Sequence, residues 1–399
     1  MIDPSTSTPS AIVLGLDCIT GLQTARALHR RGVRVTGIAH DPTHFATRTR
    51  CVERVVPAPR DDADLLACLR SLASQDRPVV IPATDAAVFF LARNAAALGS
   101  SFRLSNGGGR SIARALGKVA FARHAQEHAI PIPRTVAVED LDGLRRAAAE
   151  LSPPFLLKPD VKDERWIRQA HAKLFVAADA DELERLYARC RTWNDRFVVQ
   201  EYVDGGDDRM YSYYSFISED GRLVAECVGH KLRQWPRRTG SGTLSEHCTD
   251  DEIERCGRAL LASLDHRGHA TVNMKRDART GRLFVIEANL GRPGMGVFVA
   301  DAAGIEMIWL GHRSLAGESF SALPTARFPG ARWVCLKRDF AAAWAAWRVG
   351  ELGTLAYLGS LRGVRRYAVL DLRDPLPFLH DLFGLPDRLR RLRRRATID

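Results

Sequence analysis

The chain has 399 residues, of which 46% are hydrophobic, and a formal net charge of +11. This length and composition are enough for two or three domains with their own cores, and they exclude an intrinsically disordered chain. Eight cysteines without a C-x-x-C pair favour reduced thiols over disulfides or zinc ligands. Since there is neither a signal peptide before Ala11 nor an apolar run of about 20 residues, we expect a cytoplasmic protein.

Residues 1–105 are predicted to form a small Rossmann-like domain with a parallel sheet. The first turn, residues 15–21, places backbone amides at a helix start, but it lacks the G-x-G-x-x-G spacing of dinucleotide sites. An NAD(P)-binding Rossmann enzyme therefore stays a less favoured alternative. The α/β pattern consists of strands at residues 11–15, 33–39 and 78–81 alternating with helices at residues 21–31, 62–73 and 86–98.

Lysine is scarce in this chain, because only seven of its 58 basic residues are lysines. A preference for arginine should replace lysine wherever either residue serves, whereas a compact ammonium group is a good point charge for a phosphate. Lys158 ends the strand pattern at residues 155–157, and Lys173 opens the one at residues 174–176. Two antiparallel strands would bring these two ammonium groups together, which favours a phosphate site. The lysines are Lys118, Lys158, Lys162, Lys173, Lys231, Lys275 and Lys337.

Two later strand patterns, residues 270–275 and 284–289, carry polar side chains of metal-ligand type. If the turn between them runs from residue 278 to residue 282, with Gly281 at a positive φ, Asn273 lies opposite Glu287. Strand alternation then places Val285, Glu287 and Asn289 on one face. Carboxylate and amide oxygens are hard ligands that suit Mg²⁺ shared with substrate phosphates, so we predict a magnesium-nucleotide site on this face.

The order of motifs along residues 11 to 300 resembles the ATP-grasp superfamily, in its carboxylate–amine ligase branch. A glycine and lysine, Gly117 and Lys118, are followed by a helix and by "PIPRT" at residues 131–135. "LKP" at residues 157–159 is similar to the phosphate-binding strand of the family, and "VVQEYVDGG" at residues 198–206 is similar to its adenine hinge. "GHKLRQWP" at residues 229–236, "GSGT" at residues 240–243 and Glu287-x-Asn289 complete the series.

This resemblance implies an ATP-grasp fold of two α+β lobes around ATP, preceded by the Rossmann-like domain. The implied divisions are residues 106–200 for lobe 1, 201–325 for lobe 2 with its metal site, and 326–399 for a C-terminal region. The implied cofactors are ATP and Mg²⁺. The implied nucleotide-binding residues are Lys118, Lys158, Lys173, Gln200, Glu201, Tyr202, Val203 and Asp208; the metal ligands are Glu287, Asn289 and Asn273; and Lys231, Arg233 and Arg292 would face the reacting groups.

Four departures from the family pattern bear on these roles. Asn273 stands where a metal-binding glutamate is usual, which leaves the number of magnesium ions open. Gly291 takes the place of the usual arginine, with Arg292 one residue later. The phosphate-covering segment, residues 160–172, has no glycine, and its charges fit a mobile, solvated flap. Gly117 replaces a frequent aspartate.

The C-terminal region is expected to carry no chemistry, and Trp344 and Trp347, three residues apart on a helix, are expected to pack against the body. Much of the excess positive charge lies at residues 388–395, "RLRRLRRR". Contact of this tail with anionic lipid is compatible with its composition, but we favour a solvated tail. No interleaved aromatic residues or nucleic-acid motif indicate sequence-specific nucleic-acid binding.

The function implied by the resemblance is ATP-dependent ligation. A carboxylate would be activated as an acyl phosphate and joined to an amine, with release of ADP and phosphate. An ATP-binding regulatory protein of the same fold without ligase activity is the main alternative, because Asn273 lowers the negative charge of the metal site. The partners would be a small-molecule acid and amine whose identities stay open, as does the oligomeric state.

Overall fold

The computed structural model describes residues 8–109, 111–112, 117–161, 164–170, 172, 174–237 and 240–384. Its N-terminal part is a five-stranded parallel sheet in the order β3-β2-β1-β4-β5, which confirms the predicted parallel-sheet domain. The pattern missed β3, a short edge strand with no buried residue. The elements are β1 (Ala11–Leu14), α1 (Ile19–His29), β2 (Val35–Ala39), β3 (Arg54–Pro57), α2 (Asp62–Arg70), β4 (Val79–Pro82), α3 (Asp85–Arg93), α4 (Ala95–Leu98) and β5 (Arg103–Leu104).

A four-stranded antiparallel sheet, in the order β6-β9-β7-β8, forms the next part of the molecule. Strands β7 and β8 pair antiparallel through Leu156 and Val176, as expected for the strands next to Lys158 and Lys173. Lys173 itself lies outside the described residues. The elements are α6 (Lys118–Glu127), β6 (Thr135–Val138), α7 (Leu141–Glu150), β7 (Phe155–Pro159), α8 (Glu164–Ala170), β8 (Phe175–Ala177), α9 (Ala180–Cys190) and β9 (Phe197–Glu201).

Helix α8 anchors the segment between β7 and β8 to this sheet. Trp166 is fully buried, and its indole N–H donates to the Ala172 carbonyl at 2.9 Å. Its ring also contacts the rings of Trp193 and Phe197 edge-on. Because a buried indole binds a segment firmly to its core, the expectation of a solvated flap over residues 160–172 is wrong for α8.

A seven-stranded sheet, in the order β14-β13-β10-β11-β12-β15-β16, forms the centre of the molecule. Strands β15 and β16 come from the C-terminal region, so that region is part of this sheet. The elements are β10 (Met210–Ile217), β11 (Leu223–Trp235), β12 (Ser241–Cys248), α10 (Asp251–Ser263), β13 (Gly268–Arg276), β14 (Leu283–Leu290), α11 (Phe298–Ala303), α12 (Met307–Leu315), β15 (Arg332–Val334), α13 (Leu336–Arg348), α14 (Thr354–Ser360), β16 (Val364–Tyr367) and α15 (Leu376–Phe383).

The β13–β14 hairpin has the predicted turn, but Val285 lies on the opposite face of the sheet from the one predicted. Gly281 has a φ of 71°, and Asn273 lies directly opposite Glu287, both as predicted. A β-bulge at Ile286 then shifts the register, so that Met274 pairs with Val285. Since one extra residue reverses the alternation of faces, Val285 points into the apolar core, and the expectation that it shares the face of Glu287 is wrong.

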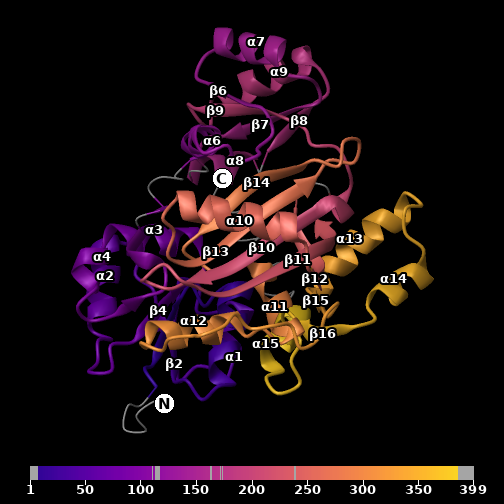
Figure 1. Cartoon of the computed structure of the whole chain (residues 1–399). Coiled ribbons are helices and arrows are strands. Elements are labelled where there is room, and N and C mark those ends of the chain that lie inside the picture. Colours follow the sequence, from indigo (N-terminus) through magenta and orange to yellow (C-terminus); the bar gives the residue numbers. More distant parts are fainter. Residues whose placement is uncertain are drawn as a thin grey trace, which may run out of the picture.

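The three parts are arranged with the four-stranded sheet at one end, the seven-stranded sheet in the middle and the N-terminal domain at the other end (Figure 1). A buried ion pair joins the C-terminal segment to the N-terminal domain, because Arg26 of α1 donates to the Asp374 carboxylate at 2.8 Å. Burial opposes ionisation of Asp374, but hydrogen bonds from Thr49 and Arg50 and the Arg26 charge lower its pKa below the usual value. No helix in the described part of the chain has the length and apolar character required to cross a membrane.

Candidate active site

A cavity of about 760 Å³ lies where the three parts of the molecule meet. The four-stranded sheet contributes Lys158 and Gln200, the seven-stranded sheet contributes Lys231 and Glu287, and the N-terminal domain contributes Thr84 among others. Such a cavity between domains, with charged and polar groups converging among apolar ones, is the usual form of a small-molecule site.

Two lysines supply positive charge at the lobe 1 wall. Lys158 is buried on β7, and its ammonium group donates to Gln200 Oε1 at 2.5 Å. Lys118 begins α6, and its ammonium group donates to the Asp160 carbonyl at 3.1 Å. The Asp160 carboxylate accepts from the Val119 amide at 2.9 Å and so caps α6. The cations face a cavity lined with polar groups, which suits an anionic ligand.

The structure explains the glycine at position 117. Gly117 has a φ of 84°, and a Cβ placed there would come within 2.6 Å of Asp160 Oδ1. Both the backbone conformation and the close carboxylate therefore require glycine. The Asp160 carboxylate, which accepts from the Val119 amide, therefore lies close to the start of α6.

The end of β9 and the two residues that follow it line the cavity where the adenine hinge is expected. Gln200, Glu201, Tyr202 and Val203 all line the cavity. Gln200 Nε2 donates to Thr135 Oγ1 at 2.8 Å, which holds its side chain between Thr135 and Lys158. Its amide orientation is therefore set by a donor on one side and an acceptor on the other.

Lys275 supports this hinge from the opposite lobe. Its ammonium group is buried, donates to the Val203 carbonyl at 2.8 Å and lies 4.6 Å from the centre of the Tyr202 ring. From the sequence, Lys275 stands out only as a rare lysine on the same face as Asn273. Its contact with the hinge spans more than seventy residues of chain, and strand periodicity carries no signal of such a distant partner.

Oxygen atoms of the kind that could hold a metal lie near the end of β14. Glu287 and Asn289 lie on the cavity side of the strand, and Asn289 pairs across the sheet with Thr271. Thr271 Oγ1 is buried without a hydrogen-bond partner among the described residues. A carboxylate, an amide and an unsatisfied hydroxyl form a donor set of hard oxygens, which fits Mg²⁺.

Asn273 differs from these groups because its carbonyl oxygen already accepts two hydrogen bonds. The Lys231 ammonium donates to Asn273 Oδ1 at 2.9 Å, and Ser212 Oγ donates to the same atom at 2.8 Å. A carbonyl oxygen has two lone pairs, so this pattern uses both of them. In this arrangement Asn273 positions Lys231 at the cavity wall.

The remaining wall combines the N-terminal domain with two arginines. Arg292 donates to Asp85 Oδ1 at 2.6 Å, next to Thr84, which caps α3. Arg338 of α13 also lines the cavity, and its guanidinium donates to the Met295 sulfur at 3.7 Å. Sequence motifs contain no sign of Arg338, because it lies in the region expected to have no chemistry.

Cys18 lies on the same wall but is not an activated nucleophile. Its sulfur accepts from the Gly21 amide at 3.3 Å and thereby caps α1. Burial raises the pKa of the Cys18 thiol above its ordinary value. Since the thiolate is the reactive form, this residue has a structural role in the wall.

Two of the predicted site residues lie away from the cavity lining. Arg233 forms a two-pronged ion pair with Asp339 of α13, at 2.8 and 2.9 Å, and donates to Ser360. It lies in a stretch of β11 where the pairing with β12 shifts register, so its guanidinium binds the C-terminal region instead of a reacting group. Asp208 is exposed, and the carboxylate pairs with Arg209 at 3.8 Å.

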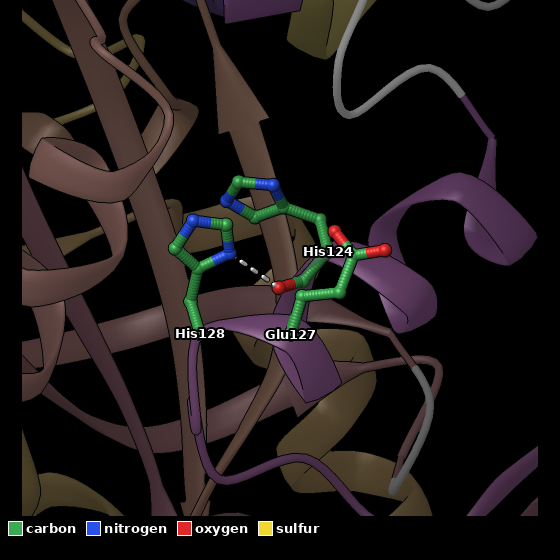
Figure 2. Close-up of side chains that lie close together, drawn as sticks. All are labelled: His124, Glu127 and His128. Carbon is green, nitrogen blue, oxygen red and sulfur yellow. Dashed lines mark hydrogen bonds between the residues drawn. The ribbon is translucent and has the colours of Figure 1, made fainter.

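A second cluster of ligand type lies on α6 outside the cavity lining. His124, Glu127 and His128 have potential ligand atoms within 4.8 Å of one another (Figure 2). The two imidazole rings stack at 4.1 Å, and His124 Nε2 is paired with Ser263 Oγ at 2.9 Å. His128 Nδ1 is bonded to the His124 backbone carbonyl at 2.9 Å. Hydrogen bonds within the protein therefore already hold one nitrogen of each ring.

A nucleotide-sized cavity between two lobes, with lysines on one side and a Glu-x-Asn strand end on the other, defines an ATP-grasp architecture. The chain has the ATP-grasp fold, and its resemblance to ATP-grasp carboxylate–amine ligases is confirmed by comparison with known proteins. No protein-family model matches the chain. The chain is similar to a D-aspartate ligase of Enterococcus faecium, with 25% identity over 203 residues. That match covers 49% of this chain and 48% of the relative, so it spans about half the length of each.

Solved structures with the same fold cover more of the chain. The biotin carboxylase domain of Hydrogenobacter thermophilus 2-oxoglutarate carboxylase, in complex with MgADP, has 13% identity and a TM-score of 0.65. The similarity covers 82% of this chain and 74% of that one. An L-amino acid ligase of Bacillus licheniformis has 17% identity and a TM-score of 0.58, with 78% and 75% of the two chains covered. At these identities the likeness concerns the fold.

Proposed function

We propose that the protein is an ATP-dependent ligase that joins a carboxylate to an amine through an acyl phosphate. The observation that carries this proposal is the placement of Lys118 and Lys158 in the same cavity as Glu287 and Asn289. Cations on one wall and metal-binding oxygens on another are what a nucleotide triphosphate with its magnesium requires. The roles of the individual residues below are part of the same proposal.

ATP would lie between the lobes, with its base at the hinge of residues 200–203. Lys158 and Lys118 would neutralise phosphate charge, and both are held in place by the oxygens of Gln200 and Asp160. Glu287 and Asn289 would hold Mg²⁺, which when bound neutralises charge on the phosphate oxygens. Fixed cations of this kind stabilise the transition state because they need no reorganisation during the reaction.

The reaction would proceed in two displacements. A substrate carboxylate oxygen attacks the γ-phosphorus, the bond to the β-phosphate oxygen breaks, and ADP leaves. The amine nitrogen then attacks the acyl carbon, inorganic phosphate leaves, and the nitrogen loses a proton. Lys231, oriented by Asn273 at 2.9 Å, would stabilise the negative charge of the acyl phosphate.

An amino acid is the favoured class for one of the substrates. Two of the similar proteins are ligases named for D-aspartate and for L-amino acids. Arg292 and Arg338, on the wall next to the N-terminal domain, would bind a substrate carboxylate, and Asp85 would receive an ammonium group. Carboxylate and guanidinium match in charge and geometry.

The test is an ADP-release assay in which acids and amines are varied independently, followed by mass spectrometry of the products. We expect ADP release only when a matched acid is present, and a condensed product that has lost one water relative to the acid and amine. Release of ADP without any condensed product would contradict the ligase assignment.

An ATP-binding regulatory protein is the second candidate, and the Lys231–Asn273 contact favours it. An ammonium group bonded to the residue at the usual metal-ligand position reduces the attraction of this side of the site for Mg²⁺. Calorimetry separates the two candidates: a protein that binds ATP with magnesium but releases no ADP with any acid and amine would be regulatory.

A further inference from the structure

Helix α13 carries a row of exposed aromatic side chains on its outer face. Phe340, Trp344 and Trp347 are 60%, 49% and 50% exposed. Their spacing of four and three residues places them on one side of the helix, and their rings contact one another at 6.4 and 5.0 Å. We call these three residues the aromatic face. The expectation that Trp344 and Trp347 pack against the body is therefore wrong.

The opposite side of α13 explains why this face stays outside. Ala342, Ala343 and Ala346 are buried against the body, and the fully buried Asp339 holds Arg233 and Thr243. Rotating the helix to cover its aromatic residues would bring large side chains into space shaped for alanine and would break a buried ion pair. The orientation of α13 is thus set by the side that carries the small alanine side chains, and the aromatic face remains in solvent.

The part of the chain that follows the aromatic face is apolar and basic. Val349, Leu355 and Leu358, in the turn after α13 and in α14, are also more than half exposed. Both carboxylates of residues 337–362 are neutralised by arginines from β11 or the turn that follows it: Asp339 by Arg233 and Glu351 by Arg237. Within the described residues, no carboxylate pairs with Arg348 or Arg362.

Figure 1 shows α13 and α14 projecting from the flank of the seven-stranded sheet. The chain continues from α15 into a segment, residues 385–399, whose sequence contains six arginines and two aspartates. At the start of α13, the Lys337 ammonium group forms an ion pair with the Asp381 carboxylate of α15, with 2.8 Å between Nζ and Oδ1. The basic end of the chain therefore starts close to the helix that carries the aromatic face.

We propose that the aromatic face of α13 binds the surface of an anionic lipid bilayer. Tryptophan and phenylalanine are well suited to the boundary between headgroups and acyl chains, and nearby arginines are attracted to anionic headgroups. The chain's own C-terminal segment is less suited to cover the aromatic face, because its arginines would be repelled by Arg348 and Arg362. A second copy would likewise bring two basic faces together.

The test uses the full-length protein and sedimentation with vesicles of phosphatidylglycerol or of phosphatidylcholine. We expect binding to the anionic vesicles, with a blue shift of tryptophan emission, and much weaker binding to the neutral ones. The double variant Trp344→Ala/Trp347→Ala should lose about tenfold or more of its partitioning, because two interfacial aromatic side chains are removed.

The matched control is Val176→Ala/Leu323→Ala, which removes two exposed apolar side chains from elsewhere on the body. It should bind vesicles as the wild type does, and both double variants should keep the wild-type melting temperature. A chain ending at Gly384 should bind anionic vesicles more weakly but still depend on Trp344 and Trp347.

Three results would overturn the proposal. The first is a wild-type protein that does not sediment with phosphatidylglycerol vesicles. The second is vesicle binding that the tryptophan variant retains in full or that the shortened chain loses completely, since the tail alone would then be the contact. The third is a dimer, detected by light scattering, that the tryptophan variant converts to a monomer.

Discussion

The end of the cavity that we propose for the nucleotide, here the nucleotide end, and the end that we propose for the substrate, here the substrate end, are built in different ways. At the nucleotide end, Lys158, Gln200, Glu287 and Asn289 all lie on strands. At the substrate end, Thr84 and Asp85 begin a helix, Arg292 follows a strand and Arg338 lies on α13. Strand periodicity allows the residues of the first end to be predicted from sequence. The residues of the second end come from segments that meet only after folding.

This contrast also concerns how the cations are held. Lys158 is bound by Gln200 within the same sheet, and Lys275 by the hinge carbonyl of Val203. Arg292 instead spans two parts of the molecule to reach Asp85, and the one side-chain hydrogen bond of Arg338 within the described residues goes to the Met295 sulfur. The lysines at the nucleotide end are thus held by oxygen atoms of the hinge segment, whereas Arg292 at the substrate end is held by a carboxylate from another part of the molecule.

The largest effect is expected from Glu287→Gln, at the nucleotide end. Removal of the only carboxylate in the oxygen set should reduce ADP release about a thousandfold, equivalent to about 4 kcal/mol of transition-state stabilisation. ADP release measured against magnesium concentration checks this. Glu252→Gln, which changes an exposed glutamate on α10, is the control and should keep full activity. Full activity of Glu287→Gln would place the metal elsewhere.

The next effect is expected from Lys158→Ala. Loss of one charge-assisted phosphate contact should weaken ATP binding by about 1.5–3 kcal/mol, which calorimetry measures directly. Lys337→Ala is the matched control, because Lys337 is exposed and its partner is Asp381, away from the cavity lining. Equal ATP affinities for the two variants would remove Lys158 from the phosphate site.

A smaller and more selective effect is expected at the substrate end. Arg338→Ala should raise the KM for the carboxylate substrate about tenfold and leave ATP affinity unchanged, since one charged hydrogen bond to the substrate is lost. Arg348→Ala, ten residues further along the same helix and outside the cavity lining, should change neither. If Arg338→Ala weakens ATP binding instead, Arg338 contacts the nucleotide, and the cavity is not divided into a nucleotide end and a substrate end as proposed.

The smallest effect is expected from Asn273→Ala. Because Asn273 Oδ1 is already bonded to Lys231 and Ser212, its loss should change the magnesium requirement of ADP release less than about twofold. The maximal rate should fall moderately, since Lys231 loses its orienting partner. A large rise in the magnesium requirement would show that Asn273 is a metal ligand after all, as inferred from the motif alone.

Some features of the fold followed from local patterns. Gly281, at its positive φ, forms the β13–β14 turn, and Asn273 faces Glu287 as the turn length required. The bulge at Ile286 was not predictable, because nothing in the residues themselves marks an extra residue on one strand. A single-residue shift of this kind moved Val285 into the core and left Glu287 on the cavity side.

Other features depended on distant partners. Arg233 sits in a motif that suggested a reacting-group contact, but Asp339, over a hundred residues away, binds its guanidinium. Trp344 and Trp347 have the spacing of a buried stripe, and helical periodicity cannot tell which of two apolar faces will be covered. The side of α13 that carries the alanines is the buried one because Asp339 lies on it and is held by Arg233 and Thr243.

The sequence by itself determined the fold class, the order of the nucleotide-binding motifs and the pairing of Asn273 with Glu287. The fold class and the motif order are what the family resemblance implies, while the pairing of Asn273 with Glu287 depends on periodicity and turn chemistry, which act between residues close in the chain. Only the tertiary structure decided that Arg338 reaches the cavity, that Arg233 does not, and that the aromatic face of α13 remains in solvent. Those outcomes depend on which distant surfaces meet, and burial and ion pairing select among them only when the whole chain has folded.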